Sequence, residues 1–433
     1  MSNIIERLRL PSLGRLLSPN VYAQGLSLAS GLLVAFLFPI LFGVAAYGDL
    51  LKTILPTLLI HRIADSMAEV LMPDLLPEEI FLGSLMSGAL VGAGLSALLA
   101  LFGAGRSDPL LLALMILTST TIITFYRNQM IWLLVCQLAF FCTVFVGLSL
   151  VEGLGANIGL RNILVIANGA GAILGFALLA WRGALFPQHG GLWSHLWKGM
   201  RRAPQSLTAT LMANTITVGY LWIAAPLMTS PAIGQLRILT SVVQASVSLF
   251  PIGLKAIFVR LLSHGEDPVD FGGLLGAAFW FFLTGFFVLQ AAAGFVPQLK
   301  ELADMFLLAV PFFWSACIER FAQAGSARGI YRLLNLVLCP IALGLGAYAA
   351  AHGQAVLGYG GVIWGYCVML ALLCLRGRLL ASVVILATFV ALLTALILYE
   401  ALPAVAAGLG LVLVALLLTP PNKTLIRYYR GHI

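Results

Sequence analysis

The chain has 433 residues, of which 61% are hydrophobic and 9% are charged, and its formal net charge at pH 7 is +8. Soluble globular domains carry about 25% charged residues, so this composition excludes an ordinary water-soluble protein. The 24 lysines and arginines are spread over many connections and do not form one patch. They therefore predict contact with anionic lipid headgroups and no nucleic-acid partner.

Apolar stretches fill the chain between Val21 and Thr419. Each has about 20 residues, enough to cross the ~30 Å hydrocarbon core of a bilayer. Backbone groups in hydrocarbon need partners within the protein, and the stretches lack the alternation of barrel strands. We expect an all-α polytopic membrane protein with about 14 transmembrane helices. The expected spans are residues 21–46, 49–72, 80–103, 109–126, 131–152, 160–181, 206–229, 237–262, 271–296, 302–320, 333–351, 355–375, 379–399 and 402–419.

The polar segments predict the orientation of these spans. Residues 1–20 place three arginines among spaced leucines, which predicts a helix on the cytoplasmic membrane surface. Residues 182–205 predict a basic cytoplasmic linker, and residues 420–433 predict a basic cytoplasmic tail. With both termini inside, 18 of the 24 basic residues fall on the inner side and five on the outer side, and Arg62 lies within a span. This asymmetry follows the positive-inside rule and indicates an even number of spans.

A weak internal repeat indicates two related halves. Residues 46–50 (AYGDL), between the first two spans, match residues 232–236 (AIGQL), between the seventh and eighth, at an offset of 186. The repeat predicts a six-helix N-lobe of residues 21–181 and a pseudo-symmetric six-helix C-lobe of residues 206–375. Two further spans would follow in residues 376–419. Repeated bundles are typical of transporters.

Two stretches and the overall layout resemble a known family. They are FGVAAYGDLLKTILPTLLIHRIADSM, starting at Phe42, and IGQLRILTSVVQASVSLFPIGLKAIFVRLL, starting at Ile233. With the layout of six, six and two spans, the chain resembles the polysaccharide flippases of the multidrug/oligosaccharidyl-lipid/polysaccharide exporter superfamily.

The resemblance implies a carrier of the bacterial inner membrane. Its two lobes would enclose a cationic cavity that opens alternately to each side, and the last two helices would shape a groove for a lipid tail. The implied substrate is an undecaprenyl-pyrophosphate-linked oligosaccharide used for O-antigen, lipopolysaccharide or exopolysaccharide synthesis. The implied partners are the polymerase and glycosyltransferases of that pathway, and no cofactor is expected. The sequence lacks a GxxxxGK[ST] motif, so we expect an ion or substrate gradient to drive transport.

Other functions remain as alternatives. A peptidoglycan-precursor flippase of the same superfamily is not separated from the first interpretation. A multidrug antiporter is disfavoured because residues 21–46 contain no Asp or Glu. A polysaccharide polymerase or ligase is the alternative from another class. The expected outer connections are short and carry no paired carboxylates or nucleophile motif, so we do not expect an enzyme. A purely structural membrane protein would not need charges within its spans.

The second expected span carries the clearest charged cluster. Arg62, Asp65 and Glu69 have the i, i+3, i+7 spacing that places them on one helical face. Charges at membrane depth cost at least ~2.5 kcal/mol each, so such a cluster needs a polar surface to face. We expect Arg62 to contact a pyrophosphate, with Asp65 and Glu69 in coupling or gating. A self-neutralising cluster that fixes helix packing is the alternative.

Other candidates lie at helix ends and in the C-lobe. A guanidinium beside an amide suits a pyrophosphate or a sugar hydroxyl, although helix-end anchoring explains several of these residues equally well. Lys255 and Arg260 are five positions apart and cannot both face one cavity centre. Glu319 is a third expected deep acid, beside Arg320. The remaining substrate-binding candidates are Arg127, Arg161, Arg237, Lys255, Arg260, Asn214 and Gln244.

Cysteines and glycines are interpreted as structural. The six cysteines lie in apolar runs without metal-ligand spacing, so we expect small buried hydrophobes and no metal site. Small-residue pairs four positions apart allow close helix approach. These pairs are Gly88 and Gly92, Gly171 and Gly175, Gly272 and Gly276, and Gly361 and Gly365.

Overall fold

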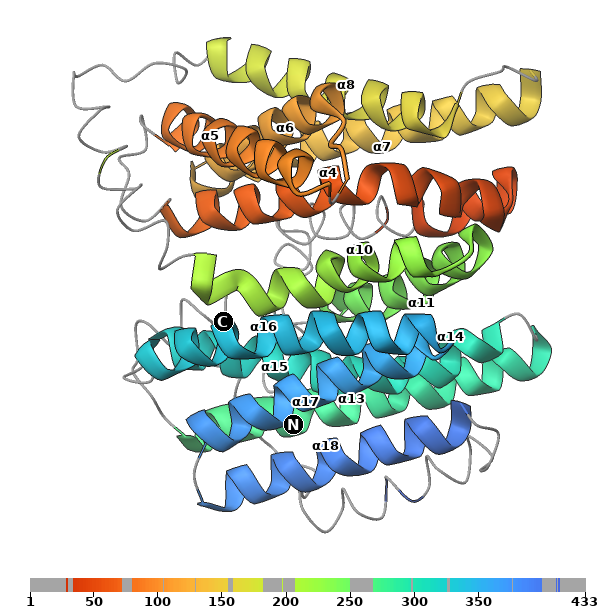
Figure 1. Ribbon diagram of the computed structural model, residues 1–433, viewed down its shortest axis with the longest axis vertical. Helices are drawn as coiled ribbons and strands as arrows, with labels where there is room; N and C mark the ends of the chain where they lie inside the picture. Colours follow the sequence, from red (N-terminus) through yellow and green to blue (C-terminus); the bar gives the residue numbers. More distant parts are fainter. Residues whose placement is uncertain are drawn as a thin grey trace, which may run out of the picture. The chain divides into compact units, whose positions relative to one another are not determined.

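The computed structural model describes ten stretches of the chain (Figure 1). They are residues 34–71, 80–103, 105–128, 130–154, 159–181, 207–249, 268–296, 299–324, 328–375 and 377–398, with single positions at 29, 197, 410 and 412. The predicted surface helix, the linker apart from Trp197, almost all of the last span, and the basic tail lie outside the described residues.

Helices make up all the regular structure in these ranges, which contain no strand. Residues 34–42 and 207–214 are also helical. The named elements are α4 (Val44–Leu71), α5 (Ile80–Leu101), α6 (Pro109–Asn128), α7 (Met130–Leu154), α8 (Leu160–Trp181), the π-turn η2 (Thr215–Gly219), α10 (Tyr220–Ala224), η3 (Ala225–Leu227), α11 (Ser230–Leu249), α13 (Pro268–Phe295), α14 (Lys300–Met305), η5 (Phe306–Leu308), α15 (Ala309–Ala324), α16 (Arg328–Ala351), α17 (Ala355–Cys374) and α18 (Gly377–Leu398).

Eight described helices are long and apolar enough to cross a membrane. Each overlaps one of the expected spans. They are Phe81–Leu101, Leu160–Trp181, Leu207–Leu227, Phe271–Phe295, Lys300–Ala322, Gly329–Ala351, Ala355–Cys374 and Leu380–Ile397. The fully described parts of α6 and α7, Pro109–Thr124 and Val135–Val151, are also apolar and fall within two more expected spans. The described part of the chain is therefore an all-helical membrane protein, and the total of about 14 spans stays a prediction.

Helices α4 and α11 are not among the eight. Both have a higher polar content than the eight. Helix α4 carries Asp49, Lys52 and Arg62, and α11 carries Arg237 and Gln244. Side chains of this kind lower the mean hydropathy of a helix and need polar partners inside a membrane protein.

The first helical break differs from the expected one. The sequence predicts a connection at residues 47 and 48, but these residues lie inside α4, which begins at Val44. The break is at Gly43, whose φ is +86°. Only glycine adopts this left-handed conformation readily, so Gly43 is suited to separate residues 34–42 from α4.

The chain divides into two compact units, and the boundary falls within α4. The first unit contains Met1–Leu41, Pro56–Ser206 and Ile433, and the second contains Phe42–Leu55 and Leu207–His432. The division inside α4 comes at Pro56, which has no N–H to donate to the preceding turn. The first part of α4 therefore packs with α11, and the rest packs with α5 and α6.

The first unit is built on close contacts with α6. Cβ atoms on Gly88 and Gly92 of α5 would lie 3.0 and 2.9 Å from the Ile116 side chain. Cβ atoms on Gly171 and Gly175 of α8 would lie 3.5 and 2.8 Å from threonines of α6. These two glycine pairs do mediate close helix approach, as the sequence predicts.

In the second unit, Gly361 and Gly365 have open space where a Cβ would be, so the prediction of close approach is wrong for that pair. The cysteine prediction also fails at one position, because Cys142 of α7 is exposed.

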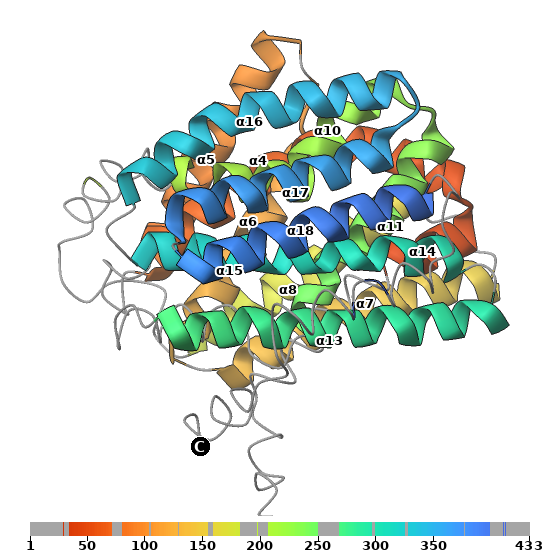
Figure 2. The ribbon, with the colours of Figure 1, turned by 90° about the horizontal axis from the view of Figure 1, so that it is seen from below.

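The second unit is centred on the span formed by α14, η5 and α15, the most buried of the eight. Figure 2 shows α16, α17 and α18 lying side by side, and α15 packs against α17. Aromatic side chains fill the core between α13 and α15. Phe282 contacts Phe313, with ring centroids 5.5 Å apart, and the Trp314 indole donates a 2.9 Å hydrogen bond to the Leu275 carbonyl.

Candidate functional site

The two copies of the sequence repeat form the starts of two helices that pack together. Helix α4 begins at Val44 and α11 at Ser230, so the helix starts keep the same 186-residue offset as the repeat. A Cβ on Gly48 would collide with the Ser230 carbonyl, and a Cβ on Gly234 would lie 2.6 Å from the Val44 carbonyl. Each repeat therefore places its glycine against the helix start of the other, as in a two-fold contact.

Polar bonds reinforce this crossing, which we define as Val44–Lys52 packed on Met228–Gly234. The Ser230 hydroxyl donates to the Asp49 carboxylate in a short hydrogen bond. The Lys52 ammonium donates a 2.7 Å bond to the Met228 carbonyl. Met228 directly follows η3, at the end of a helical segment where backbone carbonyls lack helical partners, and Lys52 satisfies one of them.

Arg237 lies two turns inside α11, about 10 Å along the axis from Ser230 at 1.5 Å per residue. The sequence places it at the outer end of its span, but α11 begins earlier, at Ser230, so Arg237 lies inside the helix. Its guanidinium donates to the Gln244 side chain, 3.4 Å away and two turns further along the same helix face. It also forms a side-chain hydrogen bond with Tyr47 of α4.

Gln244 continues this polar array onto other helices. Its amide nitrogen donates 3.0 Å to the Thr217 carbonyl and 3.5 Å to the hydroxyl of Tyr359. Both tyrosines, Tyr47 and Tyr359, are buried. The array of Tyr47, Arg237, Gln244 and Tyr359 thus gathers side chains from α4, α11 and α17 within the second unit.

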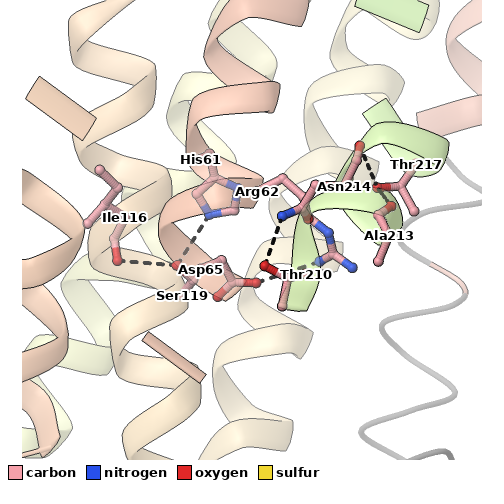
Figure 3. A network of polar contacts seen from close by, with 9 residues as sticks. All are labelled: His61, Arg62, Asp65, Ile116, Ser119, Thr210, Ala213, Asn214 and Thr217. Atoms are coloured by element: carbon pink, nitrogen blue, oxygen red, sulfur yellow. Dashed lines mark hydrogen bonds and ion pairs between the residues drawn. The ribbon is translucent and has the colours of Figure 1, made fainter. Parts of the chain in front are cut away.

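The carbonyl that Gln244 binds belongs to Thr217, within the π-turn η2. Residues Thr215–Gly219 widen the helix locally, a distortion that is frequent at functional sites. The Thr217 hydroxyl donates back to the Ala213 carbonyl, 2.8 Å away (Figure 3). The predicted candidate Asn214 is buried just before the turn, and its amide contacts the Thr210 hydroxyl at 3.5 Å.

A second polar cluster, the Glu319 cluster, consists of Glu319, Tyr331, Asn335 and Tyr366. The Glu319 carboxylate is only 7% exposed and lies 2.6 Å from the Tyr331 hydroxyl and 2.8 Å from the Tyr366 hydroxyl. These groups come from α15, α16 and α17, and Asn335 of α16 binds the carbonyls of Thr208 and Ala209. The cluster therefore joins four helical segments.

Arg62 and Asp65 form an ion pair in the first unit, on the helix face that their spacing assigns to both, as in the alternative of a self-neutralising cluster. Their charged atoms are 3.6 Å apart, and the Arg62 side chain is 49% exposed (Figure 3). The preceding residue, His61, contacts the Ser119 hydroxyl of α6 at 3.2 Å. Glu69 lies in the same helix, but its side chain is outside the described part.

Arg161 is bound to an acid that the sequence analysis does not consider. Its Nε lies 2.5 Å from Asp108, which immediately precedes α6, and its Nη1 lies 3.4 Å from Asn162. The Asp108 carboxylate also accepts from the Leu111 N–H at 3.2 Å and so caps α6. The hydrogen bond from Arg161 holds the pKa of Asp108 below its ordinary value. This pair ties the start of α8 to the start of α6.

Several predicted site residues are not tested. Lys255 and Arg260 lie outside the described residues, as does the side chain of Arg127. The structure also adds groups that the sequence analysis missed. Asp304 is a buried acid that accepts a 2.7 Å hydrogen bond from Gln290, and the sequence alone does not single it out. The sequence signal for the Glu319 cluster is the presence of Tyr331 and Tyr366 in apolar helices, where their hydroxyls need hydrogen-bond partners.

No grouping of three His, Cys, Asp or Glu side chains that would suit a metal ion occurs among the described residues. Comparison of the chain with protein-family models, curated proteins and solved structures gives no match.

Proposed function

We propose that this protein is an alternating-access flippase that moves an undecaprenyl-pyrophosphate-linked oligosaccharide across the bacterial inner membrane. The array around Arg237 is the observation that supports it most. A guanidinium within a helix of a membrane protein has to be stabilised by polar neighbours, and here Gln244 and Tyr47 both bind it. Such a fixed cation lowers the barrier to a diphosphate, which cannot enter hydrocarbon unaided.

The chemistry of the array fits both parts of such a headgroup. A guanidinium has five N–H donors in a planar fork, more than Gln244 and Tyr47 engage, and it binds phosphate oxygens in pairs. Sugar hydroxyls both donate and accept hydrogen bonds. The array offers matching groups in the amide of Gln244 and the hydroxyls of Tyr359 and Tyr47. A lipid-linked glycan presents these two chemistries next to each other.

The crossing of α4 and α11 supports the alternating-access part of the proposal. Two related helix starts that pack by reciprocal contacts are the pattern expected of repeats that move as rigid bodies. By the positive-inside assignment this crossing faces the outer side of the membrane. We propose that its closed packing represents the state that opens toward the cytoplasm.

The test is transport by the full-length protein in proteoliposomes, with an undecaprenyl-pyrophosphate-linked oligosaccharide extracted from the expressing cells. We expect Arg237→Ala to abolish transport and Arg237→Lys to weaken it, because an ammonium cannot bind phosphate bidentately. Arg106→Ala is the matched control, since Arg106 is exposed in the connection between α5 and α6. Equal transport by all four proteins would remove Arg237 from the site.

The choice of transported lipid distinguishes the proposed function from that of a peptidoglycan-precursor flippase. A peptidoglycan precursor carries the same pyrophosphate on a different sugar, so both lipids are offered to the same proteoliposomes. Movement of the precursor alone would identify a peptidoglycan-precursor flippase. Movement of neither lipid by correctly folded protein would end the flippase proposal.

A further inference from the structure

The Glu319 cluster contains more close oxygen–oxygen contacts than there are protons to fill them when Glu319 is ionised. Tyr331 lies 2.6 Å from Glu319 Oε1 and makes a still shorter contact with the Ala209 carbonyl. Tyr366 lies 2.8 Å from the same Oε1 and 3.1 Å from Asn335 Oδ1. Each of these four contacts has the length of a hydrogen bond and needs one proton between its oxygens.

The orientation of the Asn335 amide is fixed by its other contacts. Its nitrogen donates to the carbonyls of Thr208 and Ala209, at 3.0 and 3.2 Å. Turning the amide would place its oxygen against those two carbonyl oxygens, with no donor between them. Asn335 Oδ1 therefore faces Tyr366 as an acceptor, and neither it nor the Ala209 carbonyl brings a proton to the cluster.

With Glu319 ionised, two tyrosine protons serve four contacts. If both protons point at the carboxylate, the contact of Tyr331 with Ala209, the shortest of the four, has lone pairs facing lone pairs. If Tyr331 donates to Ala209, its 2.6 Å contact with Glu319 has no proton. Either choice leaves a very short contact between two oxygen atoms without the hydrogen that makes it attractive.

A proton on Glu319 Oε1 removes this conflict. Tyr366 donates to Glu319, Glu319 donates to Tyr331, and Tyr331 donates to the Ala209 carbonyl. Three protons then serve the three shortest contacts, and the contact without a proton is the longest, at 3.1 Å to Asn335. The oxygens already touch one another at hydrogen-bond distance, so a metal ion has no space between them.

The surroundings of Glu319 are mostly neutral. The tyrosines and Asn335 face it from α16 and α17, and the segment 207–214 presents backbone carbonyls. The buried thiols of Cys317 and Cys367 lie on α15 and α17. Arg320, next along α15, is the charged side chain whose electrostatic influence reaches Glu319. Its positive charge favours the ionised acid and would stabilise Glu319 after a proton leaves.

We propose that Glu319 is a proton-binding site, holding a neutral carboxylic acid in this conformation and releasing that proton as part of the transport cycle. The second half of this proposal rests on the proposed flippase function, and the first half does not. Binding converts a carboxylate and a proton into a carboxylic acid, with no other co-reactant.

Infrared spectroscopy of the full-length protein tests the first half directly. At pH 7 we expect a carbonyl-stretch band of a protonated carboxylic acid that shifts in D₂O and is lost in Glu319→Gln. Glu301→Gln is the matched control, because Glu301 is an exposed acid of α14 bound by Gln235. A wild-type spectrum without a band that Glu319→Gln removes would overturn the proposal.

A second variant keeps the test decisive if Glu319→Gln fails to fold. Tyr366→Phe removes the hydrogen bond donated to the protonated oxygen of the acid, so the frequency of the same band must change. A band that Tyr366→Phe leaves unmoved does not belong to Glu319 and would also overturn the assignment.

Proteoliposomes with an internal pH-sensitive dye test the coupling. We expect proton movement when the lipid-linked oligosaccharide is transported, and its loss in Glu319→Gln. Transport driven by a Na⁺ gradient at constant pH, without proton movement, would refute proton coupling. If wild-type protein moves no lipid-linked substrate while the infrared band is present, the flippase proposal fails and the proton site stands. Transport without the infrared band would refute the proton site and leave the flippase proposal standing.

Discussion

Gly48 of α4 and Gly234 of α11 are 186 residues apart in the sequence, and each lies against the start of the other's helix. The Gly48 position meets the Ser230 backbone, and the Gly234 position meets the Val44 backbone. Neither neighbour is a flexible side chain that can turn away. A side chain at Gly48 or Gly234 would therefore force α4 and α11 apart.

Gly48→Ala is expected to lower stability by about 1–3 kcal/mol, the usual cost of overpacking. The methyl group would collide with the Ser230 carbonyl, so α4 and α11 must separate. Thermal unfolding of the detergent-solubilised protein measures the change. Gly94→Ala is the control, because Gly94 of α5 has open space at its Cβ position and alanine favours a helix interior. A Gly48→Ala protein as stable as wild type would contradict the crossing.

Gln244→Leu is expected to impair transport nearly as much as Arg237→Ala, because Gln244 orients the guanidinium through their 3.4 Å contact. The double variant should then be little worse than either single variant, since both act on one unit. Initial transport rates in proteoliposomes complete this double-mutant cycle. Effects of the two substitutions that simply add would show that Gln244 acts independently of Arg237.

Tyr220→Phe is expected to destabilise the second unit by about 1–3 kcal/mol. Its hydroxyl donates a 2.6 Å hydrogen bond to the Ala355 carbonyl at the start of α17, and the side chain is fully buried. Removing the hydroxyl leaves that carbonyl without this donor. Tyr348→Phe on the exposed face of α16 is the control and should leave the unfolding temperature unchanged. Equal unfolding temperatures for both variants would show that the buried bond contributes nothing.

The Asp108–Arg161 pair is expected to contribute stability that depends on pH. The folded protein lowers the pKa of Asp108, chiefly through the hydrogen bond from Arg161. The contribution is therefore complete above the unfolded pKa of about 4 and is lost as the pH falls through the lower folded value.

Thermal unfolding at pH 6 and at pH 3 tests this for wild type and Asp108→Asn. We expect the variant to be less stable by up to about 1 kcal/mol at pH 6, because the pair is partly exposed, and the difference to shrink at pH 3. A difference that grows on acidification would contradict the assigned direction of the pKa change.

Rules that apply within a single segment, such as hydropathy and helical spacing, were enough to predict part of this fold. Apolar length marked the eight helices that suit a membrane, because a span must satisfy its own backbone in hydrocarbon. The i, i+3 spacing predicted that Arg62 and Asp65 share a helix face, and the two side chains are close enough there to form an ion pair. The 186-residue repeat predicted that residues 46–50 and 232–236 hold equivalent places in α4 and α11.

Contacts between distant segments could not be read in this way. Arg161 appeared as a candidate for substrate, and its bond to Asp108 depends on how α6 and α8 pack. Arg237 was placed at a helix end until the structure showed that α11 starts at Ser230. Sequence spacing reports neighbours within one helix, and it carries no information about which face of another helix lies opposite.

The sequence by itself determined that this chain is a helical membrane protein with charged residues in otherwise apolar helices, because hydropathy and helical period are properties of a single segment. Only the tertiary structure decided which of those charges are bound, and by what. The pairing of Glu319 with Tyr331 and Tyr366 brings three helices to one oxygen atom, and such a meeting point exists only once the helices are packed.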